Sequence, residues 1–213
     1  MGCTQLFVIR HGETDWNLAS RIQGHTDIPL NSTGLAQAAR LGKALADEPL
    51  AAVYTSDLQR AYQTGAAIAA QTGAPLIAHA SLRERHFGCF EGHSWDEIAS
   101  NWPEESRRWR QREPGFSPGG GESLEVFYAR CVGALEGLAR AHEGEAIAVV
   151  AHGGVLDCFY RAATRVELQA ARGWALGNAT INRLLWTGEG LTLIGWNDDQ
   201  HLQAQSLDEA AAA

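Results

Sequence analysis

An arginine and a histidine follow directly after a short run of apolar residues near the start of the chain. The run is Leu6 to Ile9, and Arg10, His11 and Gly12 come next. An arginine can hold phosphate or carboxylate oxygens through two parallel hydrogen bonds, and a neutral imidazole is a competent nucleophile or base. The pair therefore suits chemistry on an anionic substrate. The alternative is a satisfied histidine at a strand end beside a surface arginine.

The same arrangement occurs a second time, far along the chain. Residues 146–151 form another apolar run, and His152, Gly153 and Gly154 follow it. Runs of this length suit strands buried on both faces of a parallel sheet, where ligands bind just beyond the carboxyl ends of the strands. If the two strands are neighbours, His11 and His152 converge. This convergence is our central hypothesis.

A third predicted strand also leads into groups that suit an anion. Residues 50–55 form this strand, and Ser56 and Asp57 are placed to cap a helix from about residue 58 to residue 71. Arg60 falls in the first turn of that helix, where unpaired amides and a partial positive charge favour anions. The alternative is that Arg60 is an exposed surface arginine.

The remaining pattern alternates strands with helices. Leu35, Ala38, Leu41, Ala44 and Leu45 are predicted to form the buried face of a helix from about residue 31 to residue 47. Further elements are predicted at 75–78 (strand), from 122 (helix), from 155 (helix), and at 180–186 and 191–196 (hairpin). This order predicts an α/β fold, a three-layer α/β/α sandwich around a mostly parallel central sheet.

Residues 86–121 interrupt the alternation. Trp95, Trp102 and Trp109 are spaced by seven in a charged, arginine-rich stretch, and residues 96–112 could form one helix. Segments of this length between core elements are often lids or substrate-side insertions. The alternative is a solvated helical excursion without a role in binding. With 213 residues, the chain otherwise suits a single domain over residues 1–213.

Composition excludes several classes of function. The formal net charge of -8 argues against nonspecific binding to nucleic acid. Because Lys43 is the only lysine, an anion site must use arginine, histidine and backbone amides. The four cysteines show neither metal spacing nor a dense disulfide framework, and no apolar run reaches about 18 residues. We therefore expect a soluble, cytoplasmic protein without a membrane partner, and the sequence has no P-loop motif.

Taken in order, the motifs resemble the histidine phosphatase superfamily, in its phosphoglycerate mutase-like branch. They extend from about residue 4 to about residue 200, and although one tripeptide alone is a weak signal, the ordered set is highly specific. The resemblance implies a phosphoglycerate mutase-like fold. The motifs are Arg10-His11-Gly12-Glu13-Thr14 with Asn17, Gln23-Gly24, Ser56 to Ala61, Leu82-Arg83-Glu84, Gly120 to Ser123 and His152-Gly153-Gly154.

The resemblance implies that His11 is a nucleophile that forms a phosphohistidine. Arg10, Arg60 and His152 would hold the phosphoryl oxygens and neutralise charge in the transition state. Independently of the family, nearby cations disfavour a second positive charge and so keep the imidazole neutral. By the same resemblance, Glu84 would protonate the leaving oxygen and then activate water. The alternative for this glutamate is a surface ion pair with a neighbouring arginine.

The resemblance also assigns substrate-binding positions. Asn17, Gln23, Gly24 and Gly153 match positions that contact the phosphoryl group or shape its pocket in relatives. Glu122 and Ser123 could line the pocket, but we first interpret them as the start of a helix.

A metal site is a weaker interpretation of one further cluster. His86, Glu91 and His93 lie close together in the sequence, but in a segment of unknown geometry. The family mechanism needs no metal. We therefore assign no metal ligand.

Phosphatases and mutases of this branch share the catalytic centre. Here the mutase-like pattern carries Phe87 where those mutases usually have tyrosine, and the longer mutase insertion is missing. Both differences favour hydrolysis of a small phosphorylated metabolite without a cofactor. The alternative is interconversion of 2- and 3-phosphoglycerate, primed by 2,3-bisphosphoglycerate. A non-catalytic module that binds a phospho-ligand would lack His11, Glu84 or an arginine, and all are present. The family also favours a homodimer, although no residue indicates an interface.

Overall fold

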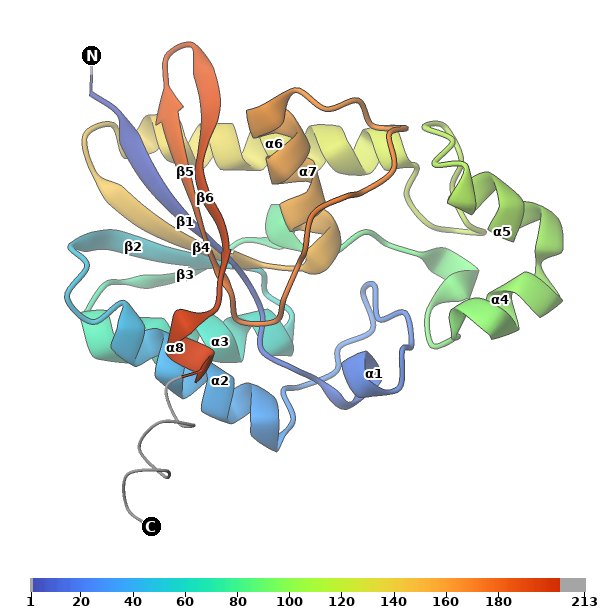
Figure 1. Ribbon diagram of the computed structural model, residues 1–213, viewed down its shortest axis with the longest axis horizontal. Coiled ribbons are helices and arrows are strands. Elements are labelled where there is room, and N and C mark those ends of the chain that lie inside the picture. Colours follow the sequence, from blue (N-terminus) through green and yellow to red (C-terminus); the bar gives the residue numbers. More distant parts are fainter. Residues whose placement is uncertain (1, 204–213) are drawn as a thin grey trace.

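The strands form one mixed sheet in a computed structural model that describes residues 2–203 (Figure 1). Within these residues the strand order is β3-β2-β4-β1-β5-β6. The first four of these strands run parallel, whereas β5 pairs antiparallel with β1 and forms a hairpin with β6. The predicted mostly parallel sheet and the predicted hairpin are confirmed. The strands are β1 (Thr4–Arg10), β2 (Leu50–Thr55), β3 (Leu76–Ala78), β4 (Ala146–Ala151), β5 (Ile181–Thr187) and β6 (Gly190–Asp198).

Two helical layers cover the sheet, which gives the predicted three-layer sandwich. On one face lie α2 (Ser32–Ala44) and α3 (Gln59–Thr72), and on the other lie α6 (Leu124–Ala141) and α7 (Gly153–Thr164) (Figure 1). Strand β1 contributes to the cores on both faces of the sheet, because its side chains point alternately to one face and the other. Leu6 and Val8 join the core under α6 and α7, and Phe7 and Ile9 join the core under α2 and α3.

Strands β1 and β4 are direct neighbours, as our central hypothesis requires. All six residues of β4 are buried, which explains their continuous apolar run. In the register between the two strands Arg10 lies opposite Ala151. Because the strands end together, the residues that follow them, His11 and His152, start from the same edge of the sheet.

The buried face of α2 matches our prediction at Ala38, Leu41 and Leu45 but differs at two positions. Leu35 is 53% exposed and Ala44 is exposed, whereas Gly34, Ala38 and Leu41 are buried. The contact at Gly34 decides this orientation, because a Cβ there would lie only 2.1 Å from the backbone oxygen of Glu13. The helix therefore turns its small residues toward the loop after β1. Asn31 caps it, as predicted, by accepting from the amide of Gly34 at 2.8 Å.

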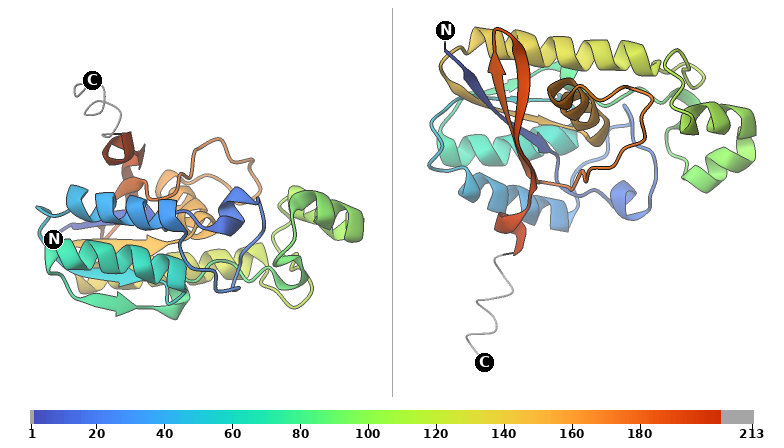
Figure 2. Two further views of the ribbon diagram at one scale, coloured as in Figure 1. Left: turned by 90° about the horizontal axis from the view of Figure 1, so that it is seen from below. Right: turned by 45° about the horizontal axis from the view of Figure 1, so that its top comes forward.

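The predicted helix at 96–112 is two helices. These are α4 (Trp95–Asn101) and α5 (Pro103–Arg110), and the break falls at Trp102, whose φ of -137° and ψ of 66° are not helical. The cause is Pro103, since a proline disfavours helical geometry in the residue before it. Both views in Figure 2 show α4 and α5 projecting at one end of the molecule. Ile98 of α4 belongs to a small apolar cluster that is separate from the two main cores. The cluster is formed by Ile22, Phe90, Ile98 and Phe116.

The short elements complete the description. They are α1 (Asp15–Leu18), α8 (Gln200–Gln203) and two 3-10 turns at Ala80–Leu82 and Gly88–Phe90. No helix in residues 2–203 is both long enough and apolar enough to cross a membrane. Residue 1 and residues 204–213 of the predicted domain lie outside the described part of the chain.

Candidate active site

The two strand-end histidines lie beside each other at the carboxyl edge of the sheet. The ring centroids of His11 and His152 are 5.2 Å apart, and the ring planes meet at 60°. Both residues are buried. The predicted convergence is confirmed in this geometry, and it follows from the pairing of β1 with β4.

One hydrogen bond fixes the tautomer of His11. Its Nδ1 lies 2.7 Å from the backbone oxygen of Gly12. A carbonyl oxygen only accepts, so Nδ1 carries the proton and Nε2 keeps its lone pair. Asn178 holds this turn in place, because its Nδ2 donates to the backbone oxygens of His11 at 2.9 Å and of Gly12 at 3.3 Å.

Both imidazoles are held in the neutral state. Burial is the main cause that lowers the pKa of His11 well below its ordinary value, followed by the positive charges of Arg60 and Arg10. Burial and then Arg60 lower the pKa of His152 in the same direction. A neutral His11 with a free Nε2 lone pair is nucleophilic at neutral pH.

Arg60 is a buried cation rather than a surface arginine. Its guanidinium donates to the backbone oxygens of Thr26 at 3.0 Å and of Gly24 at 2.7 Å. Burial lowers the pKa of Arg60 to about 10, so the group remains charged at neutral pH. The prediction that Arg60 lies in the first turn of a helix is confirmed, because α3 begins at Gln59.

The cap predicted for that helix is wrong. The residue before α3 is Leu58, which makes no side-chain cap bond. A carboxylate from a distant loop takes this place, since Asp27 accepts from the backbone amide of Gln59 at 2.7 Å. Asp57 instead pairs with Arg83 through two hydrogen bonds of 2.6 and 2.7 Å.

Arg10 lies between the end of β1 and the start of α7. Its Nη1 donates to the backbone oxygen of Leu176 at 2.5 Å. A Cβ placed on Gly153 would lie 3.5 Å from the Nε of Arg10, so this arginine packs against the first residue of α7. Burial is the main cause that lowers its pKa, and the carboxylate of Glu84 acts in the opposite direction.

Several buried polar atoms here have no hydrogen-bond partner within the described residues. They are the Nε of Arg10, the Nε of Arg60, both ring nitrogens of His152 and the Oε1 of Gln23. Leaving one such group unpaired costs about 1–3 kcal/mol, and more when it is charged. Proteins rarely keep such a set together unless a ligand completes it. Two cationic N–H groups and an imidazole N–H suit the oxygens of a phosphoryl group.

The carboxylate of Glu84 belongs to this edge of the sheet. It accepts from the backbone amide of Arg85 at 2.8 Å and from that of Gly154, in the first turn of α7, at 2.9 Å. A Cβ on Gly154 would lie 2.3 Å from the Oε1 of Glu84, so any larger residue here would displace the carboxylate. The alternative of a surface pair with Arg83 or Arg85 is wrong. Arg83 binds Asp57, and Arg85 donates to backbone oxygens at 2.8 and 2.9 Å.

The loop residues named from the sequence lie around the same centre in different ways. The Oδ1 of Asn17 accepts from the backbone amide of Thr14 at 3.1 Å and from Asn178 at 3.3 Å, so this side chain braces the loop. Gly24 has a φ of 53°, and its carbonyl holds Arg60. Gln23 is buried with an unpaired oxygen.

Two further sequence interpretations concern Ser123 and the cluster around Glu91. Ser123 caps α6, as predicted, by accepting from the amide of Val126 at 3.2 Å. Glu91 accepts from the backbone amides of His25 at 3.0 Å and Thr26 at 3.1 Å, which ties two loops together. In residues 2–203, no three His, Cys, Asp or Glu side chains are grouped so that they could hold a metal ion.

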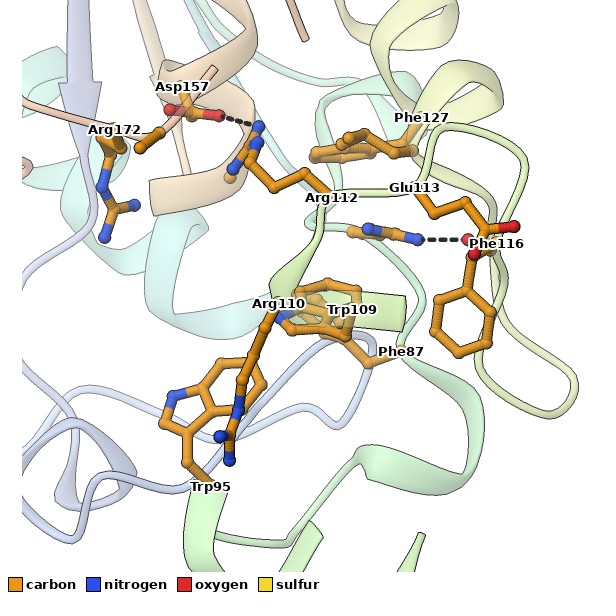
Figure 3. Close-up of a pocket in the computed structure, with 14 residues that line it drawn as sticks. Phe87, Trp95, Trp109, Arg110, Arg112, Glu113, Phe116, Phe127, Asp157 and Arg172 are labelled. Atoms are coloured by element: carbon orange, nitrogen blue, oxygen red, sulfur yellow. Dashed lines mark hydrogen bonds and ion pairs between the residues drawn. The ribbon is translucent and has the colours of Figure 1, made fainter. Parts of the chain in front are cut away.

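A cavity of about 630 Å³ adjoins Gly154 (Figure 3). Its apolar lining comes mainly from the 86–121 segment, and we call it the aromatic pocket. The aromatic side chains that line it are Phe87, Trp95, Trp109, Phe116 and Phe127. Because the amide of Gly154 also donates to Glu84, the pocket and this carboxylate contact the same residue.

Sequence reasoning missed three residues. Asn178 braces the loop after β1, and the Nε2 of His25 lies 2.9 Å from the backbone oxygen of Glu84. Arg172 lines the aromatic pocket from the chain between α7 and β5. None of them follows a predicted strand or belongs to a motif, so no local pattern marks them.

Fold and site together are those of an α/β protein whose neutral histidine lies beside buried arginines at the carboxyl edge of the sheet. The family model of the histidine phosphatase superfamily (branch 1) matches residues 6–199. The chain therefore belongs to this superfamily, as its motifs indicated.

Individual relatives extend over almost the whole chain. Phosphoglycerate mutase-like protein 4 of Arabidopsis thaliana is 38% identical over 203 residues, which cover 93% of this chain and 87% of that protein. Metal-independent phosphoserine phosphatase of the same plant is 39% identical over 207 residues, covering 94% of this chain and 84% of the other. Among solved structures, YhfR of Bacillus stearothermophilus superposes with a TM-score of 0.87 at 32% identity, covering 93% of this chain and 99% of that one.

Proposed function

We propose that the protein is a metal-independent phosphomonoester hydrolase that acts on a small phosphorylated metabolite through a phosphohistidine at His11. One observation carries the proposal. The neutral His11, with its Nε2 free, lies at the same strand edge as the unpaired buried donors of Arg10, Arg60 and His152. The relative named as a metal-independent phosphoserine phosphatase supports both the reaction and the lack of a metal cofactor.

In the first step, the Nε2 lone pair of His11 forms a bond to phosphorus while the bond from phosphorus to the alcohol oxygen breaks. The protonated carboxyl group of Glu84 gives its proton to the departing oxygen. The carbonyl of Gly12, which accepts from Nδ1, stabilises the positive charge that develops on the ring. Arg10, Arg60 and His152 balance the charge on the phosphoryl oxygens.

In the second step, water attacks the phosphohistidine. Glu84, now a carboxylate, takes a proton from the water, the bond between nitrogen and phosphorus breaks, and phosphate leaves. The two steps return His11 to its neutral form and Glu84 to its protonated form. The position of Glu84, bound to the amide of Gly154 at the mouth of the aromatic pocket, suits both proton transfers.

The proposal extends to the setting of the enzyme. The net charge of -8 suits a small anionic metabolite held in a local arginine site and disfavours nucleic acid. We place the protein in the cytoplasm as a single domain that forms a homodimer, with the 86–121 segment on the substrate side. Asn17, Gln23, Gly24 and Gly153 shape the phosphoryl site through the loops and the helix start described above.

Phosphoglycerate mutase activity is the second candidate, and the plant relative named as phosphoglycerate mutase-like favours it. The same centre would then return the phosphoryl group to a second hydroxyl instead of to water. Phe87 argues for hydrolysis, because its ring packs edge-on against Trp109 at a centroid distance of 5.2 Å and offers no hydroxyl to a phosphoglycerate.

Product analysis separates the two candidates. The protein is incubated with 3-phosphoglycerate, with and without 2,3-bisphosphoglycerate, and with O-phosphoserine, and both inorganic phosphate and 2-phosphoglycerate are measured. Hydrolysis predicts net release of phosphate and no 2-phosphoglycerate. Isomerisation that depends on the bisphosphate and releases no phosphate would overturn the proposal in favour of the mutase.

A further inference from the structure

The aromatic pocket is large for a short-chain alcohol. Its volume of about 630 Å³ falls within the range of about 300–1,000 Å³ typical of pockets for larger organic ligands. Gly154 lines it, and the amide of this glycine donates to Glu84, so the pocket adjoins the proposed proton donor to the leaving alcohol. Short three-carbon alcohols such as serine or glycerate would leave most of this space empty.

The lining of the pocket suits a flat, apolar body. Trp95 is 43% exposed although it lines the pocket, and its ring lies 5.7 Å from that of Trp109 at a tilt of 34°. The guanidinium of Arg85 lies over the ring of Trp109 at 4.3 Å. Exposed aromatic rings in a concave site are typical places for ligand rings to stack.

The same pocket carries an excess of positive charge, in a chain whose net charge is -8. Four arginines line it, together with the carboxylates Glu113 and Asp157; the arginines are Arg85, Arg110, Arg112 and Arg172.

Both of those carboxylates are already engaged. Glu113 binds Arg108 through two hydrogen bonds of 2.6 and 2.7 Å. Asp157 is shared between Arg112 and Arg161, each at 3.0 Å. Both carboxylates are therefore already paired with other arginines, although the Oδ1 of Asp157 has no hydrogen-bond partner within residues 2–203.

Two of the pocket arginines have no anionic partner. Within residues 2–203 the guanidinium groups of Arg110 and Arg172 make no hydrogen bond or ion pair, and both residues are exposed. Figure 3 shows them on different sides of the pocket, Arg110 on α5 and Arg172 on the chain after α7. The charge of Arg172 also contributes to lowering the pKa of Arg10.

We infer that the alcohol part of the substrate combines a flat, apolar body with a second negative charge, and that Arg172 and Arg110 bind this charge while the body rests on Trp95. This inference rests on the proposed hydrolase function and names its substrate class. The second charge is a carboxylate or a phosphate-like group, because arginine recognises both.

Three matched esters test the inference. They are 4-carbamoylbenzyl, 4-carboxybenzyl and 4-phosphonobenzyl phosphate. Their leaving groups share the benzyl alcohol skeleton and differ in the charge of the group at its far end. For the wild type, we expect kcat/KM for at least one charged ester to exceed that for the carbamoyl ester about tenfold or more, as charge-assisted hydrogen bonds allow. The better of the two charged esters identifies the kind of anion.

Variants locate the effect. Arg172→Gln and Arg110→Gln should each lower the ratio of charged to carbamoyl ester about fivefold or more. Arg107→Gln is the matched control, because Arg107 lies on the same helix as Arg110, is exposed and is paired with Glu104 at 2.6 Å. The ratio should not change in this control. Thermal unfolding of each variant checks that the fold is kept.

The outcomes separate the inference from the function on which it rests. Hydrolysis of all three esters at equal rates, or ratios that neither arginine variant changes, would overturn the inference alone. A kcat/KM for O-phosphoserine above that for the charged benzyl esters would overturn the part that concerns the flat body, and Trp95→Ala should lower the benzyl rates more than the phosphoserine rate. If no ester releases phosphate, the hydrolase function itself fails.

Discussion

His11 and His152 follow neighbouring buried strands, whereas Trp95 and Arg110 belong to helices that project beyond the sheet. The first region is fixed by the register of the central sheet and by the starts of α3 and α7. The second packs on a separate small apolar cluster, to which Ile22 from the loop after α1 also contributes. On the proposed function, the phosphoryl chemistry therefore belongs to the core, while the choice of alcohol depends on the 86–121 segment.

This comparison predicts two kinds of variant. Changes at the strand-end site should affect all phosphate esters, because every ester presents the same phosphoryl group. Changes in the aromatic pocket should alter the ranking of esters. The boundary between the two regions is at Gly154, which contacts Glu84 and also lines the pocket.

Glu84→Gln should give the largest effect of the variants at this boundary. Without a proton donor, kcat for benzyl phosphate should fall about 10²–10⁴-fold. The first turnover of 4-nitrophenyl phosphate should survive, since nitrophenolate leaves without a proton. Rapid mixing should therefore show a burst of nitrophenolate followed by slow turnover. Equal loss of the first turnover for both esters would show that Glu84 does not protonate the leaving oxygen.

Gly154→Ala sharpens the same point without changing an ionisable group. The new methyl would lie 2.3 Å from the Oε1 of Glu84 and displace the carboxylate, so we expect kcat/KM to fall about 10–100-fold. Gly133→Ala is the control, because Gly133 lies in the exposed middle of α6, where a Cβ meets nothing within 4 Å. It should keep full activity. Unchanged activity in Gly154→Ala would contradict the assigned position of Glu84.

The buried histidines predict a loss of stability in acid. In the unfolded chain histidine takes up a proton near pH 6.5, whereas burial and nearby arginines hold the pKa of His11 and His152 well below that value in the fold. The unfolded state thus binds more protons, and the free energy of unfolding falls as the pH is lowered from about 6.5. Each histidine contributes up to about 1.4 kcal/mol per pH unit.

Urea unfolding between pH 6 and pH 5 measures this slope. His152→Gln should reduce it by about 1.4 kcal/mol per pH unit, because one of the two groups no longer titrates. A slope that is the same in the wild type and in the variant would mean that His152 is protonated in the folded protein.

Arg112→Gln tests the aromatic pocket and should give the smallest effect. Arg112 joins the 86–121 segment to the main body, donating to the backbone oxygen of Leu168 at 2.6 Å and to Asp157 at 3.0 Å. Its loss should raise KM for the benzyl esters about threefold to tenfold, a range that the loss of one charged hydrogen bond explains. KM for O-phosphoserine should change less. An equal change for all esters would remove the distinction between the two regions.

The sequence predicted those elements that are determined by residues close together in the chain. Continuous apolar runs indicated β1 and β4, and the residues that end them indicated the site. Long-range contacts left no such signal. Asp27 reaches α3 from another loop, Gly34 turns α2 so that Leu35 is exposed, and Asn178 braces the turn at His11 from far along the chain. Among the differences from our predictions, only the break before Pro103 had a signal in the sequence, because proline is a residue type that ends helices.

The most direct test of the central claim is the covalent state of His11. Wild type and His11→Ala are incubated with 4-nitrophenyl phosphate in EDTA, phosphate release is followed, and the protein is quenched under alkaline conditions for peptide mass spectrometry. We predict release that survives chelation, a phosphoryl group on the peptide that contains His11, and loss of both in the variant. Equal release by the two proteins, or a phosphoryl group on another residue, would contradict the account.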